Sequence, residues 1–328
     1  MPVHHTARQF WVKSPGQAEI RQVSLSPRKE GDLLIRTLFS GISRGTESLV
    51  FRGEVPPSMY EPMRAPFQEG VFPGPVKYGY SSVGIVEEGL TSLVGKSVFC
   101  LYPHQDLYHV PVAAVKVIPE GVPEKRAVLA ANMETAVNIL WDARPCVGDR
   151  IVVVGAGVVG FLVAMLCQGV PGCEVVIVDP MKTRESIAAE LGLLCQATAS
   201  TLSSADLVVH SSGTVEGLRT ALTVAGDETT IVDASWYGTK DVPLPLGERF
   251  HSSRLTIKSS QVGRLPVDRL SRWTRDSRLT LALELLKDNR LDVLINRQTS
   301  FGALPSVMTE LSNGPGETLC QLVCYEES

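Results

Sequence analysis

The sequence has few cysteines and histidines, the residues that most often hold zinc in proteins. Seven cysteines and six histidines are spread over 328 residues, with no Cys-x2-Cys pair and no His-Glu-x2-His pattern. These absences argue against a zinc ribbon, a zinc finger and a metalloprotease helix. The cysteines are also too sparse for a disulfide scaffold, and their odd number favours a reducing compartment.

An excess of positive charge and a long uninterrupted apolar run are also missing. The 31 basic residues face 35 acidic ones, giving a net charge of −4, which argues against a nucleic-acid partner. The N-terminus lacks the charged region and apolar core of a signal peptide. The longest apolar stretch, 151–167, is interrupted by glycines and is short for a membrane span. We therefore expect a soluble, cytoplasmic protein that does not bind membranes.

The pattern of the chain changes near residue 121. Before it, glycine, proline and β-formers dominate, and a proline-rich loop is expected at 53–78. After it, strands alternate with helices, which predicts βαβ units and a parallel sheet in an α/β fold. The expected strands are 33–38, 82–86, 97–101, 151–154, 174–178, 206–210, 229–234, 255–259 and 318–323, and the expected helical segments are 124–142, 158–168, 184–191, 215–224 and 278–287.

The strongest motif is a glycine-rich turn between the strand at 151–154 and the helix that follows. Gly155 permits a tight turn, Gly157 lets the backbone approach a pyrophosphate, and Gly160 lets the helix pack closely on the strand. The helix opens at Val158 and Val159, where free N–H groups and the positive dipole end favour phosphates. This pattern predicts a dinucleotide-binding Rossmann unit.

An acidic residue at the end of the next strand indicates which dinucleotide is bound. Asp179 lies 24 residues after Gly155, close to the spacing of roughly 20 residues expected for a carboxylate that bonds the adenosine ribose. A carboxylate there repels a 2′-phosphate, so NAD is favoured, while Lys182 and Arg184 leave NADP open. The ends of the later strands should line the same crevice. The cofactor-contact candidates there are Ser211, Ser212, Gly213, Ser235 and Trp236, within the stretches 210–213 and 234–237.

Four segments, taken in chain order, resemble the medium-chain dehydrogenase/reductase superfamily. They are 40–47, 76–84, 132–136 and 146–150, which look like its first active-site loop, the segment that usually reads Gly-His-Glu, its interdomain helix and the Gly-Asp lead into the fingerprint strand. The first two segments are also similar to the branch named for hydroxyethyl-bacteriochlorophyllide dehydrogenase.

The resemblance covers nearly the whole chain and implies two domains. A Rossmann domain at 123–263 would be inserted into a β-rich, GroES-like catalytic domain formed by 1–122 and 264–328. It further implies a homodimer joined through the last Rossmann strand and contact between Thr135 and the nicotinamide. Arg44 is a candidate to reach the pyrophosphate, with an exposed surface arginine as the alternative.

The zinc positions of the superfamily are occupied here by residues that do not ligate zinc. The positions of the Cys ligand, the His ligand and the third ligand fall on Ser43, Tyr80 and about Ala131, and no four-Cys lobe occurs near 88–110. Since zinc in proteins takes Cys thiolate, His and carboxylate ligands, we expect neither a catalytic nor a structural zinc.

Without a metal, side chains must handle the proton that accompanies hydride transfer. Tyr80 is the first candidate because it occupies a former ligand position, and His104 is a candidate base or proton relay. Ser43 and Thr46, with Glu47, are expected to form a polar wall. Glu134 is a weaker candidate because an acid at a helix start is favoured by the dipole alone. The predicted catalytic set is Ser43, Thr46, Tyr80, His104 and Glu134.

A run of five arginines stands outside these motifs. The run comprises Arg264, Arg269, Arg272, Arg275 and Arg278. Spacing by three would place several of them on one helical face, either as a solvated surface or as a site that recruits an anionic substrate.

Three functions remain open from the sequence. The first is a zinc-independent, NAD(P)-dependent oxidoreductase that transfers hydride between the nicotinamide and a carbonyl or secondary alcohol of a small molecule. The second is an NAD(P)H-dependent enone or quinone reductase, and the third is a non-catalytic, dinucleotide-binding redox sensor. Asp179 and the Ser43–Glu47 segment favour the first.

Overall fold

The computed structural model describes residues 5–202, 204–314 and 316–325, which fold as two compact units. Unit 1 comprises Met1–Ala131 and Leu283–Ser328, and unit 2 comprises Asn132–Ala282. Both boundaries between the units, after Ala131 and after Ala282, lie further along the chain than the boundaries expected from the sequence. Each boundary falls within a helix, α3 (Ala130–Ala143) and α7 (Arg275–Leu285). No helix among the described residues is long and apolar enough to cross a membrane.

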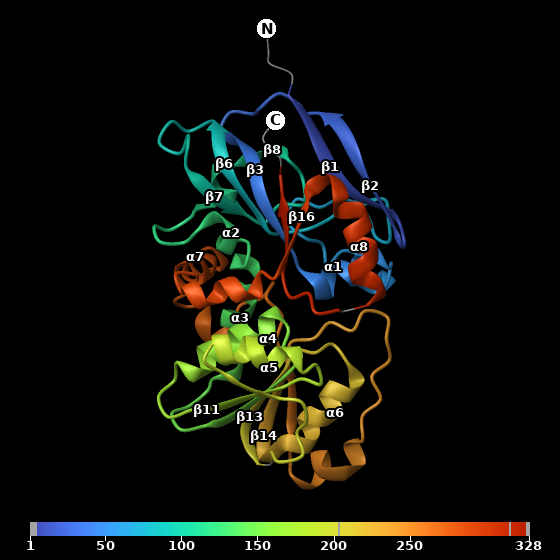
Figure 1. Ribbon diagram of the computed structural model, residues 1–328, viewed down its shortest axis with the longest axis vertical. Helices are drawn as coiled ribbons and strands as arrows, with labels where there is room; N and C mark the ends of the chain where they lie inside the picture. The colour runs from blue at the N-terminus through green and yellow to red at the C-terminus, as the bar shows by residue number, and fades with distance from the viewer. Residues whose placement is uncertain (1–4, 203, 315, 326–328) are drawn as a thin grey trace. The chain divides into compact units, whose positions relative to one another are not determined.

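Unit 2 contains a six-stranded sheet in the order β12-β11-β10-β13-β14-β15, with every neighbouring pair parallel. The strands are β10 (Arg150–Val154), β11 (Glu174–Val178), β12 (Leu194–Gln196), β13 (Ala205–His210), β14 (Ala225–Asp233) and β15 (Thr256–Ser259), and the helices packed on them are α4 (Val158–Gln168), α5 (Thr183–Glu190) and α6 (Val215–Val224). The central strand β10 is buried from Ile151 to Val154, as expected for a parallel strand covered on both faces. The predicted parallel sheet is confirmed (Figure 1).

Unit 1 is β-rich and contains two sheets. A seven-stranded sheet runs β16-β17-β3-β6-β7-β9, with β8 also paired to β3, and a four-stranded sheet runs β2-β1-β5-β4. The strands are β1 (Thr6–Ser14), β2 (Gln17–Ser24), β3 (Asp32–Ile42), β4 (Glu69–Gly70), β5 (Val76–Lys77), β6 (Ser82–Glu88), β7 (Ser97–Cys100), β8 (Leu107–Pro111), β9 (Val115–Val117), β16 (Arg297–Ser300) and β17 (Gln321–Cys324), and the helices are α1 (Arg44–Phe51), α2 (Glu124–Ala127) and α8 (Leu304–Asn313).

The C-terminal segment completes the sheet that begins near the N-terminus. Strand β17 pairs antiparallel with β3, so Val323 lies opposite Ser40 (Figure 1, red beside blue). This pairing brings Tyr325, which follows β17 directly, next to the side chain of Ser40. Residues separated by nearly the whole chain therefore share one buried region of unit 1.

Two sequence-based expectations about local structure were wrong. The segment expected as an active-site loop is the end of β3 followed by helix α1, in which Glu47, Ser48 and Leu49 are buried. The hairpin of β1 and β2 was not expected at all. Its outer strand β2 is partly exposed or exposed along its whole length, so it lacks the apolar alternation by which a half-buried strand is identified.

Candidate functional site

The glycine turn in unit 2 has the geometry that its sequence predicts. Gly155 has φ +110° and donates its N–H to Val178 O at 2.9 Å. A Cβ at Gly160 would lie 1.9 Å from Gly155 O, so only glycine fits this close approach of helix to strand. A Cβ at Gly157, the N-cap residue of α4, would meet no atom within 4 Å. The turn therefore leaves open space at the helix N-terminus, where a phosphate binds favourably.

Asp179 lies directly against this turn. One carboxylate oxygen accepts a hydrogen bond from Ala156 N at 2.8 Å, and the other accepts from Met181 N at 3.0 Å. The carboxylate is thus fixed at the end of β11, beside the glycine turn, where the ribose contact was predicted. Arg184, predicted as a cofactor contact, has a side chain that is only 2% exposed, so its position offers little surface to a 2′-phosphate.

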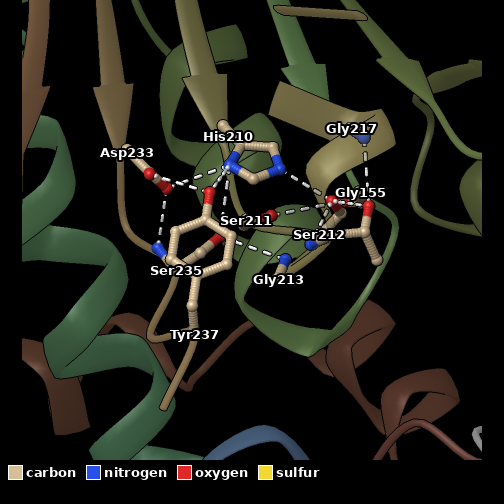
Figure 2. Close-up of polar contacts among 10 residues, drawn as sticks. Gly155, His210, Ser211, Ser212, Gly213, Gly217, Asp233, Ser235 and Tyr237 are labelled. Atoms are coloured by element: carbon tan, nitrogen blue, oxygen red, sulfur yellow. Dashed lines mark hydrogen bonds and ion pairs between the residues drawn. The ribbon is translucent and has the colours of Figure 1, made fainter. Parts of the chain in front are cut away.

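The strand ends beyond the glycine turn hold a polar cluster centred on His210, the last residue of β13 (Figure 2). Its Nδ1 lies 2.9 Å from Asp233 Oδ1, and its Nε2 lies 2.7 Å from Ser212 Oγ. Tyr237 donates its hydroxyl to Asp233 Oδ2 at 2.9 Å, and Gly213 donates its N–H to Ser235 Oγ at 3.1 Å. The predicted residues Ser212, Gly213 and Ser235 are therefore brought together at one edge of the sheet.

Electrostatics show which member of this cluster carries charge. Burial raises the pKa of the Asp233 carboxyl, but hydrogen bonds from His210, Ser235 and Tyr237 outweigh burial and hold that pKa below its ordinary value. Burial and the neighbouring Asp233 raise the pKa of Tyr237. Asp233 is thus a carboxylate and Tyr237 a neutral donor at neutral pH. Asp233 was not among the site residues predicted from the sequence, although an acid near the end of a predicted buried strand could have indicated it.

The predicted catalytic residues of unit 1 form a second cluster around His104. This histidine is 1% exposed, and its Nε2 lies 2.8 Å from Glu47 Oε2, while its Nδ1 lies 2.7 Å from Ser40 Oγ. Ser40 Oγ lies 3.0 Å from the Tyr325 hydroxyl. Glu47 in turn accepts a hydrogen bond from Ser43 N at 2.7 Å. Ser40 lies in the segment expected as the first active-site loop but was not among the predicted catalytic residues, and Tyr325 was not expected because only the pairing of β17 with β3 brings it to Ser40.

Tyr80 belongs to the same cluster. Its side chain forms hydrogen bonds with those of Ser43 and Thr46, and it lies close enough to Glu47 to feel the charge of that carboxylate. Burial and Glu47 together raise the pKa of Tyr80 to about 12, against the two hydrogen bonds, which lower it. Tyr80 is therefore a protonated phenol at neutral pH and suits the role of proton donor better than that of base.

Glu134 has a structural partner. It lies inside α3 rather than at its start, and its Oε1 is 3.1 Å from Arg278, whose guanidinium also donates to Asn138 Oδ1. The expected solvated face of arginines was wrong for Arg278, which is 2% exposed. Arg269 stacks on Trp141. The exposed members are Arg264, Arg272 and Arg275.

Four further residues predicted to contact the cofactor have defined positions in the structure. Arg44 is the first residue of α1, and Thr135 lies in α3; both are partly buried and have partners of their own. Trp236 and Ser211 follow β14 and β13 and are also partly buried. Their roles toward a cofactor stay predictions.

The donor set of unit 1 does not fit a zinc ion. Within the described residues, no group of three or more His, Cys, Asp or Glu side chains is arranged to hold a metal. Glu47 and His104 are the two plausible ligands near Tyr80, and they are bonded to each other. Ser43 is the residue preceding α1, and Ala131 is 6% exposed and has no donor atom in its side chain. A catalytic zinc takes three protein ligands, and these residues do not provide them.

Comparisons with known proteins agree with this architecture. No family model matches the chain. The sequence is 26% identical over 319 residues to D-guloside 3-dehydrogenase of Escherichia coli K12, covering 88% of this chain and 91% of that protein. The fold matches L-idonate 5-dehydrogenase of E. coli K-12 with a TM-score of 0.78 at 13% identity, covering 98% and 99% of the two chains.

A second solved structure carries a cofactor. It is a short chain alcohol dehydrogenase of E. coli CFT073 complexed with NADH, with a TM-score of 0.75 at 16% identity, covering 97% of this chain and 99% of that one. The predicted α/β architecture with a separate β-rich part is shared with both structures. The chain is thus similar in sequence to named dehydrogenases and similar in fold to dehydrogenases of the alcohol dehydrogenase-like kind.

Proposed function

We propose that the chain is an NAD(P)-dependent oxidoreductase that interconverts a carbonyl and a secondary alcohol of a polyhydroxylated small molecule, such as a sugar derivative, without zinc. The single observation that carries the proposal is the buried Glu47–His104 pair beside Tyr80, 2.8 Å from oxygen to nitrogen, where a metal would otherwise serve. The relatives support the substrate class, since D-guloside 3-dehydrogenase and L-idonate 5-dehydrogenase are both named for carbohydrate substrates.

In this proposal unit 2 is the dinucleotide-binding domain and unit 1 is the catalytic, GroES-like domain of a zinc-free branch. Gly155, Gly157 and Gly160 with the start of α4 would hold the pyrophosphate, and Asp179 would hold the adenosine ribose. The carboxylate of Asp179 favours NAD over NADP, because a 2′-phosphate beside it would place like charges together. A bound nicotinamide supplies or accepts the hydride.

The residues of unit 1 handle the proton. In the reducing direction the carbonyl carbon gains a hydride and its oxygen gains a proton, which the neutral Tyr80 hydroxyl donates or stabilises by a hydrogen bond. In the oxidising direction the alcohol proton leaves as the hydride leaves carbon, and the Glu47 carboxylate with His104 is the acceptor. The raised pKa of Tyr80 disfavours its phenolate as that base.

A hydrogen-bonded chain extends from Glu47 into the interior of unit 1. The Glu47 carboxylate accepts from His104 Nε2–H, so Nδ1 accepts from the Ser40 hydroxyl, and Ser40 Oγ accepts from the Tyr325 hydroxyl. Every donor in this chain then points toward Glu47. The chain thus keeps Glu47 as an acceptor, ready to take the alcohol proton in the oxidising direction.

The test is turnover with a substrate panel and a metal assay in parallel. The purified chain is incubated with NADH or NADPH and a set of ketoses, keto sugar acids, simple ketones and enones, and oxidation of the cofactor is followed at 340 nm. We expect turnover with hydroxylated ketones, no stimulation by zinc and no inhibition by chelators. Turnover of enones alone, or cofactor binding with no turnover of any substrate, would contradict the proposal, as would loss of activity on zinc removal.

The proposal includes a homodimer formed through β15. Within the described part of the chain β15 pairs with β14 alone, so its other edge presents backbone N–H and C=O groups. A second copy adding its own β15 would satisfy them. Light scattering of the purified protein at micromolar concentration should give twice the 35.5 kDa chain mass, and a monomer at that concentration would reject the dimer.

A further inference from the structure

The His210 cluster ties together the backbone of two loops at the carboxyl edge of the unit 2 sheet (Figure 2). The loop after β13 is held by Ser212 on His210 Nε2, and the loop after β14 is held by Ser235 N on Asp233 Oδ1 at 3.0 Å. The two loops are joined directly where Gly213 N donates to Ser235 Oγ. His210 itself has no exposed side-chain surface. It is a buried connector between loops rather than a surface group.

The direction of the hydrogen bonds in this cluster follows from the charge of Asp233. A carboxylate only accepts, so His210 presents Nδ1–H to it and accepts the Ser212 hydroxyl at Nε2. Ser212 Oγ then accepts from Thr214, 2.9 Å away, and Thr214 Oγ1 accepts from Gly217 N at 3.0 Å at the start of α6. One unidirectional chain therefore runs from the start of α6 to Asp233, and each member depends on the next for its orientation.

The cluster also contacts the glycine turn. Ser211 donates its N–H to Val154 O at 2.9 Å and its hydroxyl to Gly155 O at 3.2 Å. A Cβ at Gly155 would lie 2.7 Å from Ser212 N, so the two loops touch with no room between them. A shift of Ser212 would therefore move the glycine turn that would receive the pyrophosphate.

The strand order indicates which half of the dinucleotide the cluster serves. With the pyrophosphate at the turn after β10, Asp179 at the end of β11 takes the adenosine half on one side. Strands β13 and β14 lie on the other side of β10, so the ends of these strands are left for the nicotinamide half. The loops that His210 orients are the ones after these two strands.

We infer that His210, fixed by Asp233, is a positioning residue that shapes the loops at 211–213 and 234–237 to receive the nicotinamide half of the cofactor. This inference rests on the proposed function and adds a residue that works through its neighbours rather than by contact. It requires that loss of His210 weaken binding of the whole dinucleotide more than binding of the adenosine half.

The experiment titrates the full chain with NADH and with ADP, which lacks the nicotinamide half, by isothermal calorimetry. We expect His210→Phe to raise the Kd for NADH about tenfold or more, as for loss of a hydrogen bond to a charged partner, while the Kd for ADP stays near the wild-type value. His210→Asn keeps a donor where Nδ1 lies and should restore part of the affinity. His210→Gln keeps only the side facing Ser212 and should restore less.

Gly217→Ala provides a variant that removes no polar group and does not alter His210. Its Cβ would lie 2.1 Å from Ser212 Oγ and 2.8 Å from His210 Nε2, so the added methyl group must displace these two side chains. It should weaken NADH binding in the same direction as His210→Phe. This second route keeps the inference testable if His210→Phe does not fold.

Thr229→Val is the matched control. Thr229 is 4% exposed and donates its hydroxyl to Ala205 O at 2.7 Å, so it links the same two strands at their opposite end. Its loss should lower the Tm and leave both Kd values unchanged.

The possible failures are distinct from one another. Wild-type NADH affinity in His210→Phe and Gly217→Ala, or equal losses for NADH and ADP, would overturn the inference alone. If the wild-type chain binds neither NADH nor NADPH, the proposed function fails first, and this inference fails with it.

Discussion

Each unit of the molecule contains a carboxylate, a buried histidine and a serine bonded in a row, and the two rows differ in the groups that they contact at their ends. In unit 1 Glu47 lies on His104 Nε2 and Ser40 lies on Nδ1. In unit 2 the carboxylate lies on Nδ1 of His210 instead, with the serine on Nε2. The same three kinds of side-chain group thus form two different hydrogen-bonded arrangements.

The surroundings decide the difference. The row in unit 1 has a hydroxyl at each end, because Tyr80 lies near Glu47 and Tyr325 bonds Ser40. The row in unit 2 also has hydroxyls at its ends, from Tyr237 and Thr214, but backbone N–H groups of the loops donate to both ends as well, and the row continues to the start of α6. Backbone donors at both ends suit the row in unit 2 to fixing loop shape, whereas the row in unit 1, within the described residues, has such a donor only at Glu47 and suits proton transfer. A histidine next to an acid therefore does not by itself identify a catalytic pair.

The largest expected effect separates the two carboxylates. Glu47→Gln removes the proton acceptor while keeping an oxygen for Ser43 N, and should lower kcat about 10²–10⁴-fold, the range of general acid–base catalysis, with no change in the Kd for NADH. Asp233→Asn should do the reverse and act mainly on that Kd. Steady-state kinetics and calorimetry measure both. If Glu47→Gln changed only the Kd for NADH, Glu47 would not be the proton acceptor, and the two carboxylates would not differ in role.

Tyr80→Phe should come next. The variant keeps the ring but deletes the donor that Ser43 and Thr46 orient, and kcat in the reducing direction should fall by roughly 10²-fold. Tyr237→Phe is the matched variant in unit 2, since it removes a hydroxyl bonded to a carboxylate there, and it should retain kcat more fully. Comparable kcat losses in both variants would mean that Tyr80 has no special place in the chemistry.

The raised pKa of Tyr80 also predicts a pH effect on stability. The folded pKa of about 12 lies above the ordinary value of 10.0, so folding favours the protonated phenol. This contribution to the free energy of unfolding is complete below pH 10 and is lost as the pH rises toward 12. It amounts to at most about 3 kcal/mol. Urea unfolding between pH 9 and 11.5 should therefore show a shallower decline for Tyr80→Phe than for the wild type; parallel curves would contradict it.

Cofactor choice should shift by a smaller factor. Asp179→Ser removes the carboxylate that Ala156 N and Met181 N hold beside the glycine turn. It should weaken NADH and strengthen NADPH, each by about tenfold, as for one hydrogen bond or one like-charge contact. Competitive titration of the two cofactors measures the ratio. An unchanged ratio would place the adenosine ribose away from Asp179.

The smallest effect tests the far end of the row in unit 1. Ser40→Ala leaves His104 Nδ1 without the hydroxyl 2.7 Å away and should lower kcat about fivefold, the equivalent of one ordinary hydrogen bond of ~1 kcal/mol. Ser82→Ala is its control, since Ser82 is a buried serine bonded to the tyrosine hydroxyl of Tyr108 at 3.1 Å. That control should cost stability without lowering kcat. Equal kcat values for the two variants would remove Ser40 from the proton path.

The elements of unit 2 were largely predictable, whereas unit 1 was predicted only in part, with β3, β6, β7 and β17 close to expected strands. Helices α4 and α6 and strand β11 have the expected bounds, because each alternating element of a parallel sheet carries a clear apolar signal. In unit 1 the helix α1 was taken as a loop and the β1–β2 hairpin was missed. Short, half-exposed antiparallel strands carry a weak pattern, and their register is set by neighbours distant in the chain.

The sites divide in the same way. Gly155, Gly160 and Asp179 were readable because their roles depend on local backbone geometry and fixed spacing. Tyr80 and His104 were readable as side chains capable of acid–base chemistry, but the extension of their cluster to Ser40 and Tyr325 was not. Ser40 and Tyr325 are 285 residues apart in sequence and meet only through the pairing of β17 with β3. Glu134, suggested by its position in the sequence, has its partner in Arg278.

The sequence by itself determined the parallel sheet, the glycine turn and the residues unable to ligate zinc, because each depends on residue type and short spacing. Tertiary structure alone decided which histidine lies beside which hydroxyl. His104 and His210 are both buried and both bonded to a carboxylate and a serine. Their proposed roles differ because strand pairing places the Tyr325 hydroxyl beyond Ser40, whereas Thr214 and the start of α6 lie beyond Ser212, and hydrogen bonds act only over contact distances.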